Sequence, residues 1–571
     1  MIRKFCFSLT LLVLFQCKPQ KKVLSSDDYL DLVRTEFTGD LAYETTAFVE
    51  KYWRVAGNTG FNESVYWIEK HLKKAGYVLE SDANPSDVLT YRIEKRPLKN
   101  PTWEPVSASL KIAGQDVPIL VSETNRNMTY LNSVSTPRDG ITAEVVSITN
   151  LEDLKATSLT GKIVFVEQSI WPFYKELLAK GVLGIITYNN PSYLQPEKNT
   201  TSIQFRSLPP QLESKLWGIA LSFDAKEKLK ASLEKGENKV HVNIKTKIYA
   251  SEELTIIADI KGSKMPKERI VFSAHIQEPG ANDNATGVGA QLEMASIAAN
   301  LITNNKIALD RSMTFLWGDE IISTRRYITD DEKRAADIKW GISLDMVGEN
   351  TAITGGSFLI EKMPDPSAIW TRGKDKHSEW GGDVLALEDM KPHYLNDFII
   401  SNFKKQGAFA NWEVNTNPFE GGSDHMPFLD ADIPGLLLWH FTDQFYHTDN
   451  DRIDKVSKET LKNVGVGALA SGLQLVNSNS KTASGILENL VKISNKRLSN
   501  EFELSKVAIK EGANIADEKA IILAWEDWYK KAFESVSDMS YGEDKKLHEE
   551  INNAKTAMAL NVKNILLELE K

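Results

Sequence analysis

The sequence predicts an α/β fold: a mixed sheet with helices on both faces, an inserted β-rich segment and a helical C-terminal region. Short apolar runs alternate with amphipathic helical patterns from about residue 253 to 478, which is typical of a sheet covered by helices. The pattern changes on both sides of this stretch, to many short apolar runs before it and to helical spacing alone after it. The length of 571 residues exceeds what one ordinary core holds, so two or three domains are expected.

The first residues predict a targeting segment. A basic start, Met1–Lys4, precedes an uncharged and mostly apolar run over 5–15, which is too short to span a bilayer but has the length of a signal-peptide core. The end of this run resembles a bacterial lipobox, so residues 1–17 are predicted to be a lipoprotein signal peptide with Cys17 as the lipidated first residue. An uncleaved anchor or a plain signal is the alternative. The protein would then be exported and lipid-anchored in the bacterial cell envelope, on the outer membrane, in the periplasm or on the surface face.

Composition excludes some function classes. The net charge of −10 argues against nucleic acid as a partner, because nucleic-acid binding needs clustered Lys and Arg. The only cysteines are Cys6, inside the signal, and Cys17, so the mature chain keeps no thiol for a disulfide, a nucleophile or a metal. Any metal must be held by His and carboxylate side chains.

The other segments follow in chain order. Residues 28–77 show helical spacing, clearest at Val65, Ile68 and Leu72. Short apolar runs separated by Gly, Pro, Asn and Ser predict a β-rich domain with a few helices over 102–247, inserted between two pieces of the sheet domain, 28–101 and 248–478. Residues 480–571 are predicted to be helical, as a cap or as the surface of a homodimer.

Ligand-type side chains follow the predicted strands of the sheet domain. The strand candidates are Thr255–Ile260, Arg269–Ser273, Ser312–Trp317, Ile342–Met346 and Gly435–Trp439. At or beyond their ends, or in the loop before the next helix, stand His275, Asp283, Glu320, Asp345 and His447. Ligands bind at the carboxyl ends of strands in such sheets, and burying like charges together is costly without a cation. The pattern therefore predicts a pair of divalent metal ions, and this ligand set is compatible with zinc.

The sequence resembles peptidase family M28, the co-catalytic zinc aminopeptidases and their glutamate carboxypeptidase relatives, over about 28–478. The segments that carry the resemblance are 54–58, 273–275, 280–287, 319–320, 344–348, 422–428 and 446–449. The resemblance implies a zinc-exopeptidase-like fold and hydrolysis of peptide bonds with two zinc ions, although other divalent transition metals suit such ligands. Residues 159–166 and 177–188 resemble the protease-associated domain, a module that carries no catalytic residues.

Carried over by motif, the resemblance implies that Asp283 bridges the two ions. His275 and Asp345 would complete one site, and Glu320 and His447 the other. Asp319 would be the general base. Asp424, His425 and Tyr446 would lie behind the ligands or in the substrate pocket.

Two positions depart from the family pattern. The family has Glu-Glu where this chain has Asp319-Glu320, and a shift by one residue would instead make Glu320 the base and put Ile321 where a ligand belongs. The family also has Asp two residues after the first His, whereas this chain has Gln277, whose amide could orient the imidazole of His275. Neighbouring Glu278 is an alternative for that role and for moving the proton.

The function expected is an exopeptidase, most simply an aminopeptidase, acting on peptides outside the cytoplasm. One alternative is a glutaminyl cyclase-like acyl transfer on the same fold with one zinc. The other is a non-catalytic, receptor-like binding protein. The sequence leaves open the side-chain preference and the choice between aminopeptidase, carboxypeptidase and dipeptidase.

Overall fold

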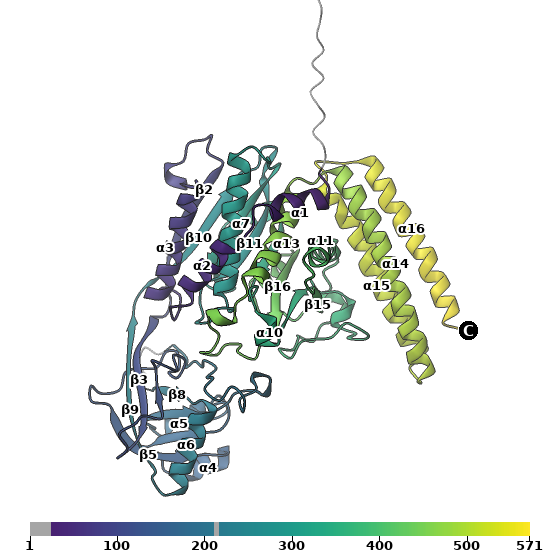
Figure 1. Ribbon diagram of the computed structural model, residues 1–571. Coiled ribbons are helices and arrows are strands. Elements are labelled where there is room, and N and C mark those ends of the chain that lie inside the picture. The colour runs from purple at the N-terminus through teal and green to yellow at the C-terminus, as the bar shows by residue number, and fades with distance from the viewer. Residues whose placement is uncertain (1–23, 211–215) are drawn as a thin grey trace, which may run out of the picture.

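The computed structural model describes residues 24–210 and 216–571 (Figure 1). The predicted signal peptide and Cys17 lie outside the described residues. A nine-stranded mixed sheet forms the larger part, in the order β1-β2-β10-β12-β11-β13-β16-β14-β15. Its strands are β1 (Val78–Leu79), β2 (Leu89–Pro97), β10 (Glu252–Ile260), β11 (Met265–His275), β12 (Arg311–Gly318), β13 (Ile338–Leu344), β14 (Ser357–Glu361), β15 (Asn415–Asn417) and β16 (Gly435–Phe441). The α/β class with a mixed sheet is confirmed.

Helices cover both faces because neighbouring residues of the buried strands point to opposite sides. On β11, Phe272 belongs to the large core shared with helices on one face, whereas Val271 joins a smaller core on the other. The first face carries α1 (Ser26–Arg34), α2 (Asp40–Val49), α3 (Thr59–Lys74), α7 (Ala285–Thr303), α11 (Leu395–Ala410) and α13 (Lys458–Val476). The second carries α8 (Ile322–Thr329), α9 (Glu332–Asp337) and α12 (Met426–Asp430).

The central strands determine where the functional residues meet. β11 runs parallel to β12 and β13, and β13 runs parallel to β16. The carboxyl ends of these four strands therefore share one edge of the sheet. His275 ends β11, Glu320 comes two residues after β12, and Asp345 follows β13 directly.

A second sheet has its own core within the stretch predicted as an insertion. Its order is β4-β3-β9-β5-β6-β7-β8, with β3 (Thr102–Ile112), β4 (Leu120–Val121), β5 (Ile141–Ser147), β6 (Ile163–Val166), β7 (Gly184–Thr187), β8 (Gly218–Ala220) and β9 (Lys239–Tyr249). Three helices accompany it, α4 (Leu151–Ala156), α5 (Tyr174–Ala179) and α6 (Phe223–Glu234). Its identity as a protease-associated domain stays a prediction.

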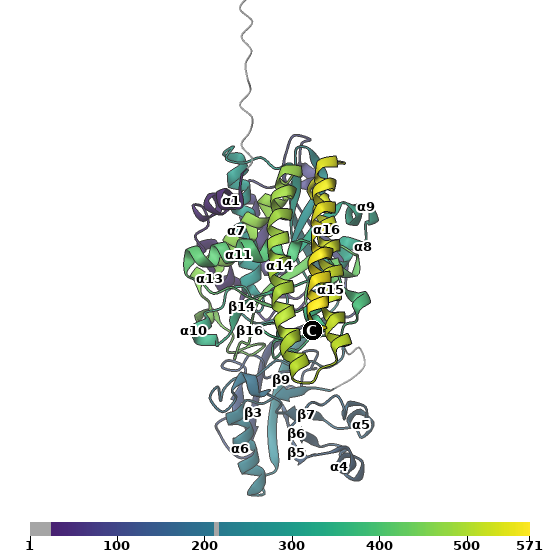
Figure 2. The ribbon, with the colours of Figure 1, turned by 90° about the vertical axis from the view of Figure 1, so that its right-hand side faces the viewer.

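The C-terminal region consists of three long helices, α14 (Ser480–Lys510), α15 (Ile515–Ser535) and α16 (Lys545–Glu568). Figures 1 and 2 show them side by side along one flank of the sheet domain, on the side opposite α3. Arg372 ties a loop of the sheet domain to this region through ion pairs with Glu501 at 2.8 Å and Glu518 at 2.6 Å. Across the described ranges, no helix combines the length and apolar character needed to cross a bilayer. The predicted homodimer surface stays a prediction.

Candidate metal centre

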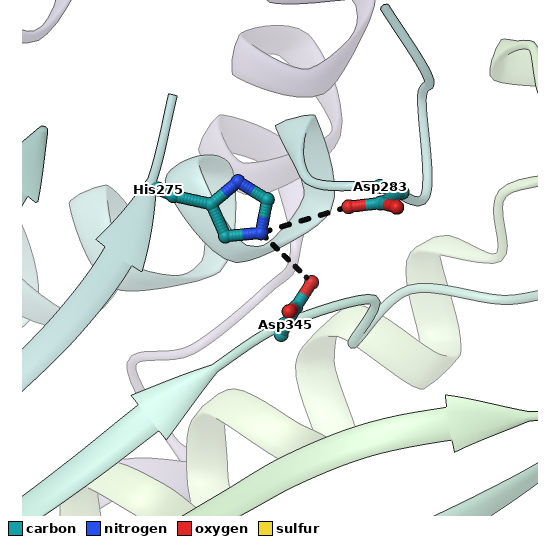
Figure 3. A group of neighbouring side chains, drawn as sticks. All are labelled: His275, Asp283 and Asp345. Carbon is teal, nitrogen blue, oxygen red and sulfur yellow. Dashed lines mark ion pairs between the residues drawn. The ribbon is translucent and has the colours of Figure 1, made fainter. Parts of the chain in front are cut away.

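Three side chains from separate elements converge at the shared strand edge (Figure 3). Nε2 of His275 lies 3.2 Å from Oδ1 of Asp345 and 3.6 Å from Oδ1 of Asp283. His275 and Asp283 are buried, with 1% and 6% of their side chains exposed, and Asp345 is partly buried. Nδ1 of His275 faces the backbone carbonyl of Gln277 at 3.3 Å, which leaves Nε2 turned toward the carboxylates.

A second group shares Asp283 with the first. Nε2 of His447 lies 2.8 Å from Oδ2 of Asp283 and 3.1 Å from Oε2 of Glu278. Asp283 thus presents one oxygen to each imidazole, as a carboxylate that bridges two metal ions does. The sequence prediction placed Glu320 beside His447, and the structure places Glu278 there instead.

The loop that carries Asp283 does not use its carboxylate to cap the following helix. Asn284, one residue later, caps α7 by accepting the Gly287 N–H at 2.9 Å. The Asp283 side chain is therefore not used as the helix cap, the ordinary role of an Asp at a helix start. Asp451 holds the loop by accepting the N–H groups of Asn282 at 2.9 Å and Asp283 at 3.1 Å. Gly287 permits the close approach of α7 to the end of β13, because a Cβ there would meet the Leu344 carbonyl oxygen at 2.3 Å.

The donor set fits two zinc ions. Nε2 of His275, Oδ1 of Asp345 and Oε2 of Glu278 are buried polar atoms without a hydrogen-bond partner, and each faces one of the two groups. Ligands at about 2.0–2.2 Å in a tetrahedral arrangement stand roughly 3.3 Å apart. The spacings of 2.8–3.6 Å between imidazole and carboxylate atoms match that requirement.

Electrostatics also favour cations here. Burial, with the charge of Asp283, raises the pKa of Glu278 to about 7. Burial works to lower the pKa of His447, but the charge of Glu278 and the hydrogen bond to Asp283 bring it to about 10. The pKa of His275 is likewise held well above its ordinary value, against burial, by the charges of Asp345 and Glu320. Without a metal the imidazoles thus hold protons to balance the carboxylates, and metal ions would displace those protons.

Glu320 lies on the side of His275. Its Oε1 is 3.9 Å from Nε2 of His275. The Gln277 amide holds it at two points: Nε2 donates to Oε2 of Glu320 at 3.1 Å, and Oε1 accepts the Glu320 N–H at 2.7 Å. Gln277 therefore orients Glu320 with its side chain, whereas its backbone carbonyl faces His275. Burial raises the pKa of Glu320 well above its ordinary value.

Asp319 occupies a different position from the one the general-base prediction needs. The cavity of ≈ 230 Å³ beside the two groups is lined by Glu278, Asp283, Glu320, Asp345 and His447, but not by Asp319. The Asp319 N–H donates to Ser323 Oγ at 2.8 Å at the start of α8. Burial raises the pKa of Asp319 to about 7. Of the two neighbouring acids, Glu320 is the one that lines the cavity.

Of the three remaining predicted residues, only Tyr446 lines the cavity. Its ring stacks on His447 with centroids 3.7 Å apart. Asp424 accepts the N–H of Ile321 at 2.7 Å and the hydroxyl of Thr324 at 3.1 Å, so it fixes the backbone after Glu320. His425 is fully buried, and its Nε2 lies 3.0 Å from Glu361, away from the cavity lining.

Several contributors were missed by sequence reasoning. Ser423 donates to Oδ2 of Asp345 at 2.8 Å and so leaves Oδ1 for His275. Arg54, fully buried, donates to the carbonyls of Ile276 at 2.6 Å and Gly280 at 2.8 Å, on either side of Glu278. The segment 54–58 was noted in the sequence. Hydrogen bonds from one side chain to distant backbone carbonyls, however, leave no local sequence pattern.

The inserted segment contacts the loop that carries His447 through residues 203–205 and through Asn127, whose Nδ2 donates to the His447 carbonyl at 3.3 Å. Phe205 donates its N–H to the His447 carbonyl at 2.9 Å, and the two rings lie 4.5 Å apart. Gln204 forms an antiparallel bridge with Thr448. The loop that carries His447 is therefore supported from the second sheet.

Comparison with known proteins agrees with this geometry. Residues 255–471 match the sequence model of peptidase family M28. The chain is 24% identical over 433 residues to aminopeptidase YwaD of Bacillus subtilis, covering 72% of this chain and 79% of that protein. It is 23% identical over 447 residues to an aminopeptidase of Pseudomonas aeruginosa, with 72% and 74% covered. A solved structure of a zinc aminopeptidase from Bacillus subtilis superimposes with a TM-score of 0.52 at 19% identity, over 76% of this chain and 94% of that one, a likeness that establishes the fold.

Proposed function

Because the chain belongs to peptidase family M28, we propose that this metallopeptidase is an aminopeptidase that uses two zinc ions to remove N-terminal residues from peptides. The observation that carries the proposal is Asp283, whose two oxygens face two different imidazoles, at 3.6 Å from His275 and 2.8 Å from His447. A single-metal centre would need only one of these imidazoles.

The residues would divide between the two ions as follows. His275 and Asp345 would hold one ion, His447 would hold the other, and Asp283 would bridge them. When bound, the ions supply an activated water and polarise the scissile carbonyl. Ser423 keeps Asp345 in place by donating to its second oxygen.

Glu320 is the group placed to move the proton. It lines the cavity, and Gln277 fixes both its backbone N–H and its Oε2. Burial raises the pKa of Glu320 above its ordinary value, and a shift in this direction favours a carboxylate that accepts a proton from water and returns it to the leaving amine. Asp319, outside the cavity lining, would support the start of α8.

The cavity suits the end of a peptide. Its ≈ 230 Å³ falls below the roughly 300–1,000 Å³ of sites for drug-sized ligands, which is room for about one residue of a peptide. Trp380, Leu437 and Trp439 form its apolar wall. An apolar or aromatic N-terminal side chain fits that wall, and the relatives named aminopeptidases support the choice of the N-terminus.

The test combines metal analysis with cleavage of a peptide library. The full chain, purified in detergent without chelator, should hold about two zinc ions and should cleave peptides with free N-termini but not the same peptides after N-acetylation. One ion per chain with cyclisation of N-terminal glutamine would favour the cyclase alternative. Absence of stoichiometric metal, even after reconstitution, would refute the proposal.

We further propose that the protein works outside the cytoplasm, anchored to the cell envelope by lipid on Cys17. The support is the N-terminal sequence alone: a basic start, a short apolar run and a cysteine at its end.

A further inference from the structure

We propose that Glu278, and not Glu320, is the carboxylate that completes the second metal site together with Asp283 and His447. The proposal rests on the proposed two-metal function and specifies its ligands. It departs from the assignment that the family resemblance implies, in which Glu320 accompanies His447.

The distances favour Glu278. Oε2 of Glu278 lies 3.1 Å from Nε2 of His447, and Oδ2 of Asp283 lies 2.8 Å from the same nitrogen. One donor atom from each of these three residues lies within 4.8 Å of the others. Oε2 of Glu278 is buried and has no hydrogen-bond partner, so a cation between it and His447 would satisfy an atom that is otherwise orphaned.

Glu320 is engaged elsewhere. Its Oε2 accepts from the Gln277 amide at 3.1 Å, and its Oε1 lies 3.9 Å from His275, the imidazole of the first site. Among the described residues, the only carboxylates within 4.0 Å of a His447 ring nitrogen are those of Glu278 and Asp283.

The loop before Asp283 is built to hold Glu278 in this position. Glu278 has φ = +85°, a left-handed conformation that few non-glycine residues adopt and that such residues keep where surrounding contacts enforce it. Its N–H donates to the Arg54 carbonyl at 2.9 Å. The Arg54 guanidinium binds the carbonyls of Ile276 and Gly280, and Arg126 donates to the carbonyl of Pro279. The backbone is thus fixed on both sides of Glu278, and within the described residues the polar contacts of its side chain are with Asp283 and His447.

This arrangement assigns metal binding and proton transfer to two acids from different loops. In the family pattern the two roles fall to the adjacent acids Asp319 and Glu320. Glu278 comes from the loop after β11, and Glu320 from the loop after β12. With Glu278 as the ligand, Oε1 of Glu320 stays available for proton transfer on the side of His275.

The experiment measures metal stoichiometry and affinity without reference to activity. Full-chain parent, Glu278→Gln, Glu320→Gln and Glu379→Gln would be stripped of metal and titrated with Zn²⁺ against a competing chelator. Glu379 is the matched control, because it is exposed and precedes Trp380 of the cavity wall. We expect two ions for the parent, the control and Glu320→Gln. For Glu278→Gln we expect one tight ion, with the second weakened beyond the roughly 10–100-fold that loss of an outer-shell partner causes.

Co²⁺ substitution gives an independent readout, because loss of one carboxylate ligand changes the visible spectrum of the second ion bound. If Glu278→Gln does not fold by circular dichroism, Glu278→Asp keeps the carboxylate but shortens its reach, and it should bind two ions with only the second weakened. Two tight ions in Glu278→Gln, or loss of one ion in Glu320→Gln, would overturn the assignment while leaving the two-metal function standing. A parent without metal would overturn both.

Discussion

Arg54→Ala should destabilise the protein more than any exposed arginine substitution, because Arg54 is a buried backbone clamp. Its side chain donates to the carbonyls of Ile276 at 2.6 Å, Gly280 at 2.8 Å, Val49 at 3.0 Å and Tyr52 at 3.2 Å. Burial lowers the pKa of Arg54 to about 10, against the charges of Asp283 and Glu278, so the group stays charged at neutral pH.

The magnitude follows from these contacts. Each buried carbonyl left without a partner costs about 1–3 kcal/mol, and water entering the vacated space recovers part of that cost. Removing one partner from a buried charged network typically costs about 3–5 kcal/mol, which is the loss expected in the free energy of unfolding. Arg54→Lys keeps the charge but not the planar fork, so about 1–3 kcal/mol is expected.

The assay is urea unfolding of the metal-free protein followed by far-UV circular dichroism, with Zn²⁺ titration of the folded variants. The matched control is Arg325→Ala, since Arg325 is 51% exposed and pairs with Asp430, which is 53% exposed. That control should change stability by less than about 1 kcal/mol. If Arg54→Ala also stays within about 1 kcal/mol and binds both ions as the parent does, the clamp explanation is wrong.

Three further predictions concern other parts of the chain. Glu320→Gln should lower the rate about 10²–10⁴-fold with both metals retained, and Asp319→Asn should lower it less; steady-state rates with metal content checked decide between the two acids. Burial, with the charge of Asp365, raises the pKa of Asp397 to about 6, so the unfolded chain loses this proton first as pH rises and stability falls between about pH 4 and 6. Asp397→Asn should therefore stabilise the protein by about 1–3 kcal/mol at pH 7 and by nothing below pH 4 in denaturation experiments. Cys17→Ser should move the protein from the membrane to the soluble fraction, and unchanged partitioning would place the anchor elsewhere.

The central strands could be predicted because they are buried on both faces. Strands of this kind appear as continuous apolar runs, as in Ile270–Phe272 of β11 and Leu436–Leu438 of β16. The edge strands carry no such signal. β15 is Asn-Thr-Asn, and it is defined only by its pairing with β14.

The sequence indicated which residues form the site, but not which carboxylate lies beside which imidazole. Parallel strands bring His275, Asp345 and Glu320 to one edge, which sequence order and apolar runs suffice to indicate. Which carboxylate then meets His447 depends on loop conformation. Glu278 has φ = +85° and Ile321 has φ = +60°. Neither residue type suggests such a turn, since few non-glycine residues adopt positive φ and β-branched residues do so least of all.

The placement of His447 shows why the inserted segment matters to a centre whose ligands all lie outside it. His447 stands six residues beyond β16 and itself has φ = +60°, so no strand fixes it. Phe205 of the insertion binds its carbonyl and faces its ring, and Arg126, from the same insertion, binds the carbonyl of Pro279 next to Glu278. Two groups of the proposed second metal site are therefore held from outside the sheet domain, whereas His275 and Asp345 of the proposed first site stand at the ends of central strands. The second site is consequently the more sensitive of the two to any change in how the inserted segment sits.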